Sequence, residues 1–138
     1  MDLQFEKPPE QGRFGNCWLI AVLNVLWSTR IDILKNLVRA LPCGRIAIQL
    51  VPGTLWLWPS FPATSCQPLW AACIEKAVAH HMGGYEKMNM NRVSYACQLL
   101  LPKYSLRQIP CASNIAVIST PRGYHSQGIY ELWELTIP

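Results

Sequence analysis

The chain has 138 residues, of which 51% are hydrophobic and 14% are charged, and its formal net charge is +4. This length fits one domain with a sizeable core, and the composition excludes a disordered tail. Because soluble domains have about 25% charged residues, we expect a further domain or a protein partner to cover part of the apolar surface. The basic residues are scattered along the chain, so nucleic-acid binding is not expected.

The first predicted element is an apolar helix that begins at Cys17 and ends near Trp27. Almost all of its side chains are apolar, so most of its surface should be buried. The run is shorter than the ~20 residues that a membrane span needs, and residues 1–10 have no apolar signal-peptide core. We therefore expect a cytoplasmic protein without a membrane span, in which the six cysteines are mostly reduced thiols.

The next segments predict a helix and then a pair of strands. A second helix is expected over Asp32–Leu41, where leucine and valine recur at three- and four-residue spacing before Pro42. Residues 46–58 then have extended character on both sides of Pro52-Gly53, which is a turn signal.

A third helix is expected to begin at Pro68 and to end at Gly83-Gly84. Its apolar side chains recur on one face, and Glu75 and Lys76 are expected at a solvated edge.

The last third of the chain turns from helix to strand. A short helix is predicted over Val93–Leu101, and Asn114–Ser119 and Ile129–Ile137 are predicted strands around the loop TPRGYHSQG. Helices that come first and strands that come last indicate an α+β fold.

Cys17 lies where the first helix begins, in the stretch QGRFGNCWLIAVL. A helix N-terminus favours a thiolate, which is the nucleophile in thiol-based acyl transfer. The side-chain amide of Gln11 and the backbone N–H of Cys17 could both donate to the oxyanion that forms, and Gly12 and Gly15 permit a tight backbone path between them. A cysteine in front of an apolar helix is usually a core residue when taken alone, but these neighbours favour a nucleophile.

The pattern Q-G-x-x-G-N-C-W resembles the nucleophile motif of papain-like cysteine proteases, and the whole stretch most resembles the calpain branch. Residues 69–86, LWAACIEKAVAHHMGGYE, are similar to the calpain helix with the core W-x-x-[LI]-[LI]-E-K-A-x-A, and IAIQLVP is similar to the intervening strand. The resemblance implies one papain-like domain over residues 1–138, with a helical lobe at about 11–101 and a partial β lobe at about 102–138. It also implies a thiol endopeptidase that acts on a protein or peptide substrate and needs no cofactor.

The resemblance places the general base at the start of a β-lobe strand. His125 matches that position loosely, whereas His80 and His81 lie in the helix that has no base in this family. The N-P-W motif that supplies the orienting Asn and the acidic calcium loops of calpains have no counterpart. Two hypotheses follow. The chain is either an active endopeptidase with Cys17, His125 and Gln11 in its site, or an inactive module that binds or regulates a partner through its apolar surface.

A zinc site is not expected. Four possible ligands lie close in sequence, but no pair of them has the Cys-x-x-Cys spacing of a structural zinc site. They are Cys66, Cys73, His80 and His81.

Overall fold

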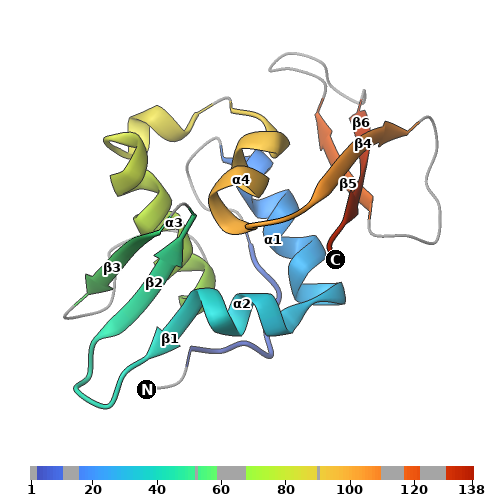
Figure 1. Ribbon diagram of the computed structural model, residues 1–138. Helices are drawn as coiled ribbons and strands as arrows, with labels where there is room; N and C mark the ends of the chain where they lie inside the picture. Colours follow the sequence, from blue (N-terminus) through green and yellow to red (C-terminus); the bar gives the residue numbers. More distant parts are fainter. Residues whose placement is uncertain are drawn as a thin grey trace.

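The computed structural model describes residues 3–10, 16–51, 53–58, 68–89, 91–109, 117–121 and 130–138. These residues form a mixed arrangement of helices and strands, which confirms the expected α+β class (Figure 1). The elements in chain order are α1 (Cys17–Thr29), α2 (Ile31–Leu37), β1 (Val38–Ala40), β2 (Ile46–Leu50), β3 (Thr54–Trp58), α3 (Leu69–Met82), the 3-10 helix η1 (Tyr85–Met88), α4 (Val93–Leu100), β4 (Ser105–Ile109), β5 (Val117–Pro121) and β6 (Tyr130–Thr136).

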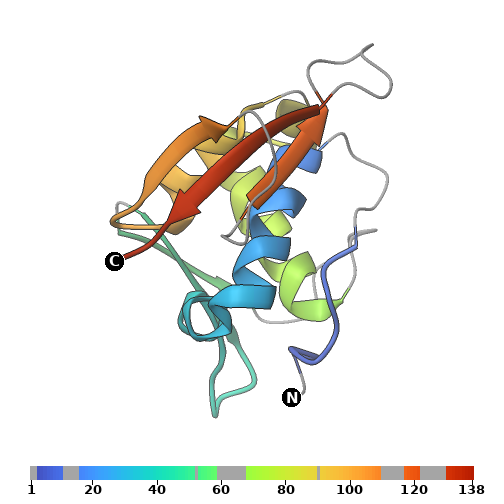
Figure 2. The ribbon, with the colours of Figure 1, turned by 90° about the vertical axis from the view of Figure 1, so that its right-hand side faces the viewer.

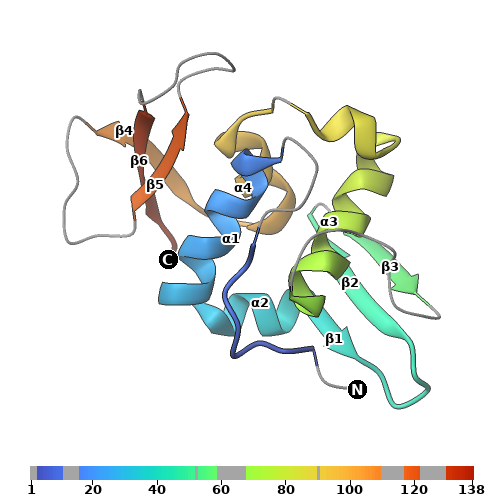
Figure 3. The same ribbon diagram turned by 180° about the vertical axis from the view of Figure 1, so that it is seen from behind.

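Helix α1 is the apolar helix predicted to begin at Cys17, and that prediction is confirmed. It lies between α3 on one side and the sheet of β4, β5 and β6 on the other (Figures 1 and 3). Its fully or almost fully buried side chains are Trp18, Leu19, Ile20, Val22, Leu23, Val25 and Leu26. No described helix is by itself long and apolar enough to cross a membrane, and α1 and α2 are bent by 118° where they meet.

The predicted second helix is wrong in its last turn. Helix α2 ends at Leu37, and residues 38–40 form strand β1, which pairs antiparallel with β2. Val38 fits the helical spacing of the sequence and is 1% exposed in the strand. Pairing with β2 therefore satisfies the backbone of this segment without exposing its apolar side chain, so the tertiary partner overrides the helical pattern.

The described residues form two antiparallel three-stranded sheets, in the orders β1-β2-β3 and β4-β6-β5. Strands β2 and β3 lie where residues 46–58 predicted them, with Gly53 at φ 114° in the turn between them. Strands β5 and β6 overlap the two predicted C-terminal strands. Strand β4 was not predicted, because its mostly exposed residues carry little apolar pattern and its pairing partner, β6, lies far away in sequence.

Helix α3 begins one residue after the predicted start and ends as predicted. Gly83 adopts a left-handed conformation at φ 101°, and its N–H and that of Gly84 both donate to the carbonyl of Ala79. This is the usual way in which glycine ends a helix. Helix α4 ends at Leu100, two residues before Pro102.

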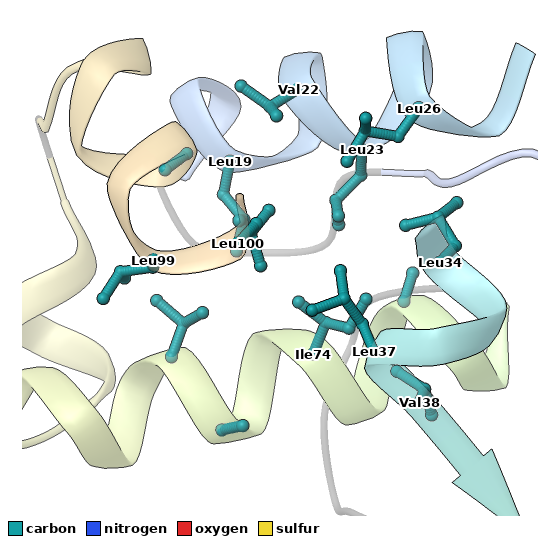
Figure 4. Close-up of a cluster of buried hydrophobic side chains, with 14 of the residues drawn as sticks. Leu19, Val22, Leu23, Leu26, Leu34, Leu37, Val38, Ile74, Leu99 and Leu100 are labelled. Carbon is teal, nitrogen blue, oxygen red and sulfur yellow. The ribbon is translucent and has the colours of Figure 1, made fainter. Parts of the chain in front are cut away.

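The main core lies where α1, α2, α3 and α4 meet (Figure 4). Leucines dominate it, and Ile74 of α3 faces them from below in the view of Figure 4. Residues 3–10 run along the outside of α1 and α3, where the indole groups of Trp27 and Trp70 donate to the carbonyls of Phe5 and Lys7. The core thus packs α1 against α2, α3 and α4. The N-terminus of α1 lies at one end of the molecule.

Candidate functional site

Of the three residues predicted to form a catalytic site, the structure describes Cys17. It is the first residue of α1 and is half-buried. Gln11 and His125 lie outside the described residues, so their roles remain predictions.

The described thiols differ in their surroundings. Cys73 and Cys97 are fully buried, and burial raises the pKa of each to about 12, although the nearby charge of Lys76 opposes the shift at Cys73. Cys43 is exposed in the turn between β1 and β2. Cys17 combines partial exposure with a position at the start of a buried helix, so its surroundings are those of neither a core thiol nor a loop thiol.

The start of α1 is tied to α3 by a buried hydrogen bond. The side-chain Nδ2 of Asn16 donates to Oε2 of Glu75 over 2.7 Å, and both residues are 0% exposed. The Oδ1 atom of Asn16 is also buried and has no hydrogen-bond partner among the described residues. Asn16 and Glu75 belong to the two stretches that carry the family resemblance, so this bond brings those stretches into contact.

Trp18 ties the same helix end to two further elements. Its side chain is 2% exposed, and its indole Nε1 donates to the carbonyl oxygen of Met88 in η1 over 2.7 Å. The indole also packs against the ring of Tyr95 in α4, with centroids 5.8 Å apart. Cys17 therefore lies between two residues that are buried and hydrogen-bonded.

The N-terminal end of α1 carries no acidic side chain in its first turn, and the side chain of Asn16 does not cap it. The backbone carbonyl of Asn16 accepts from the N–H groups of Leu19 and Ile20. The carboxyl group of Glu75 nevertheless lies close to this helix start, because it accepts a hydrogen bond from the side chain of Asn16, the N-cap residue.

The hairpin of β5 and β6 approaches α1 from the side opposite α3. Strand β5 packs against α1. Pro121 pairs with Tyr130, and this is the last strand pair before the segment that connects β5 to β6. The end of the hairpin at Pro121 and Tyr130 lies at the same end of the molecule as the N-terminus of α1 (Figures 2 and 3). His125 belongs to the segment that joins the two strands, which lies outside the described residues.

The expectation that Glu75 lies at a solvated edge is wrong, because it is 0% exposed. Its helical neighbours Ala71, Ala72 and Ala79 are also buried, so α3 is covered on this face as well. Three alanines around one carboxyl residue are a sequence signal for close packing, and they could have revealed that this Glu faces another element.

His80 and His81 are exposed in the last turn of α3. Within the described ranges, no group of three or more His, Cys, Asp or Glu side chains is placed to hold a metal ion. Cys66, one of the four residues weighed for zinc, lies outside those ranges. A cavity of about 260 Å³ is lined by Lys7, Pro8, Glu10 and Pro68, which include neither a thiol nor an imidazole.

Comparisons of the chain with protein-family models, with curated proteins and with solved structures found no match.

Proposed function

We propose that the chain is a calpain-like thiol endopeptidase with a papain-like fold and that Cys17 is its nucleophile. The observation that carries the proposal is the position of Cys17, which is half-buried at the uncapped start of a buried central helix. The buried thiols Cys73 and Cys97 have pKa values raised to about 12, so they stay protonated near neutral pH and are poor nucleophiles.

The proposed reaction has two halves. The Cys17 thiolate attacks the peptide carbonyl carbon, and the carbonyl oxygen becomes an oxyanion that accepts hydrogen bonds from the backbone N–H of Cys17 and the side-chain amide of Gln11. Protonated His125 donates its proton to the leaving amine as the C–N bond breaks, which leaves a thioester on Cys17. His125 then takes a proton from water, the hydroxide adds to the thioester, and the carboxylic acid product leaves as the thiolate re-forms.

Two features of the fold support the assignment of these roles. The hydrogen bond from Asn16 to Glu75 joins the stretch that contains Cys17 to the helix with the second resemblance. The connecting segment of the β5–β6 hairpin contains His125. The hairpin end from which this segment leaves, at Pro121 and Tyr130, lies at the same end of the molecule as the start of α1 (Figure 2). A substrate chain that lies across this end would contact the helical part on one side and the sheet on the other.

Site-resolved alkylation of the cysteines by iodoacetamide between pH 5 and 9, read by mass spectrometry, tests the proposal. Cys17 should react at pH 6 much faster than exposed Cys43, which is the internal control for access. Replacing His125 by Ala should slow the reaction of Cys17, whereas the matched replacement of exposed His81 by Ala should not.

Hydrolysis of a generic peptide is the second measurement. Cys17→Ala should abolish it, and Cys43→Ala should leave it unchanged. Because the chain has no N-P-W motif to orient the histidine, turnover should be slow; in serine proteases, a wrongly held imidazole lowers turnover by roughly 10⁴. Absence of hydrolysis, together with a Cys17 that labels no faster than Cys43, would instead support the inactive binding module.

A further inference from the structure

Glu75 is a buried carboxyl group in α3, and the other buried residues of this helix are apolar. We infer that Glu75, acting through Asn16, is a positioning residue that holds the first turn of α1 and so orients Cys17. This inference rests on the proposed function, because it assigns a role within the same site.

The energetics of burial argue that Glu75 is there for a purpose other than packing. A carboxyl group that leaves water loses hydration, and a hydrophobic residue of similar size is often as stable or more stable at such a position. The structure shows what the group contacts, since Glu75 accepts from Asn16 over 2.7 Å. The bond joins residues 59 positions apart, so it fixes one helix relative to another.

The behaviour of Asn16 points in the same direction. An Asn at the N-cap position usually accepts a hydrogen bond from an N–H of the first turn with its own side chain. Here the side chain makes no such bond and turns to Glu75 instead, while Oδ1 stays buried without a partner in the described chain. The local cap is given up for a bond to α3, which holds the backbone immediately before Cys17.

The direction of this bond separates positioning from direct catalysis. Helix α3 and the β4–β6–β5 sheet lie on opposite sides of α1, as two views from opposite directions both show (Figures 1 and 3). Asn16 faces α3, so the pair of Asn16 and Glu75 holds the start of α1 on its α3 side, away from the sheet. It does not extend toward the hairpin whose connecting segment contains His125.

Three single variants test the inference. Glu75→Gln keeps an oxygen acceptor for Asn16 and should keep the ratio of Cys17 to Cys43 alkylation at pH 6 within about twofold of the wild type. Glu75→Leu removes the acceptor but fills the site, and it should lower that ratio about tenfold or more, because a small misplacement of a reacting group has large kinetic effects. Asn16→Ala removes the same bond from the other side and covers the case in which Glu75→Leu does not fold.

Two readouts separate positioning from a merely structural role. The thermal midpoint of each variant reports stability, and peptide hydrolysis should show a lower kcat with little change in KM, because no substrate contact is removed. The double variant N16A/E75L should be no worse than Glu75→Leu alone, because Glu75→Leu already removes the bond to Asn16. A Cys17-to-Cys43 ratio that stays within twofold of the wild type in folded Glu75→Leu or Asn16→Ala would overturn the inference.

The outcomes also distinguish this inference from the proposed function. A wild-type protein that cleaves peptides, with folded Glu75→Leu and Asn16→Ala variants that cleave them equally well, would refute positioning and keep the endopeptidase. A wild-type protein without peptidase activity, in which both variants still slow Cys17 alkylation, would keep positioning and refute the endopeptidase.

Discussion

Replacing Trp18 with Phe removes the indole N–H that donates to the carbonyl of Met88 over 2.7 Å and keeps an aromatic ring beside Tyr95. A buried acceptor that loses its donor destabilises a protein by about 1–3 kcal/mol. The smaller ring also leaves a void that costs on the order of 1 kcal/mol. We therefore expect Trp18→Phe to lower the free energy of unfolding by about 2–4 kcal/mol.

The size of the chain converts this loss into a shift of the thermal midpoint. An unfolding entropy of about 2.1 cal/mol/K for each of 138 residues gives about 0.29 kcal/mol/K, so each kcal/mol lowers Tm by about 3.5 °C. Trp18→Phe should therefore lower Tm by about 7–14 °C. Circular dichroism during heating measures this shift directly.

Trp27 offers a matched control at the other end of the same helix. Its indole donates to the carbonyl of Phe5 over 2.8 Å in a partly buried setting, so Trp27→Phe should cost only about 1 kcal/mol and about 3–4 °C. Trp18→Phe should also slow alkylation of Cys17, whereas Trp27→Phe should leave it unchanged. An equal loss of Tm in both variants, or equal rates of Cys17 alkylation, would refute the view that Trp18 holds the end of α1 that carries Cys17.

Two further predictions concern stability. The pKa of Cys73 and of Cys97 is raised by burial to about 12, above the ordinary thiol value, so the unfolded chain loses these protons first; stability should be intact below about pH 9 and fall above it by about 1.4 kcal/mol per pH unit for each thiol. Melting curves from pH 8 to 10.5 should show a shallower fall for C73A/C97A than for the wild type, and equal slopes would contradict the assignment. Gly83 has φ 101° and open space around its Cα, so Gly83→Ala should lower stability by about 1–2 kcal/mol through backbone strain alone, and an unchanged urea midpoint would contradict the left-handed helix end.

Local signals predicted the parts of the fold that depend on nearby residues. The apolar run after Cys17 predicts α1, because the hydrophobicity of its side chains favours burial. Gly83 predicts the end of α3, because glycine readily adopts the left-handed conformation. The failures at residues 38–40 and 105–109 share another cause. Both segments are strands because another strand pairs with them. The partner of residues 38–40 is β2, the next strand along the chain, and the partner of residues 105–109 is the distant strand β6.

The candidate site also has features that nearby residues predict and features that depend on a distant residue. The position of Cys17 at the start of a helix could be predicted from its own neighbours, whereas the bonding partner of Glu75 could not, because Asn16 lies 59 positions away. Spacing within one helix places a carboxyl group on a face, but it does not show what lies against that face. The roles of Gln11 and His125 remain predictions, since both residues lie outside the described ranges.

The residues that carry the resemblance have an unexpected distribution of contacts. Asn16 and Trp18 flank Cys17, and both turn away from solvent, with hydrogen bonds to Glu75 and to Met88. These two positions of the motif therefore hold the first turn of α1 in place. Cys17, which lies between them, is partly exposed. A module that had lost catalysis would need the same buried bonds in order to fold, so the bonds alone do not separate an enzyme from its inactive relative. Peptide hydrolysis that is lost in Cys17→Ala does separate them, because an inactive module does not cleave peptides.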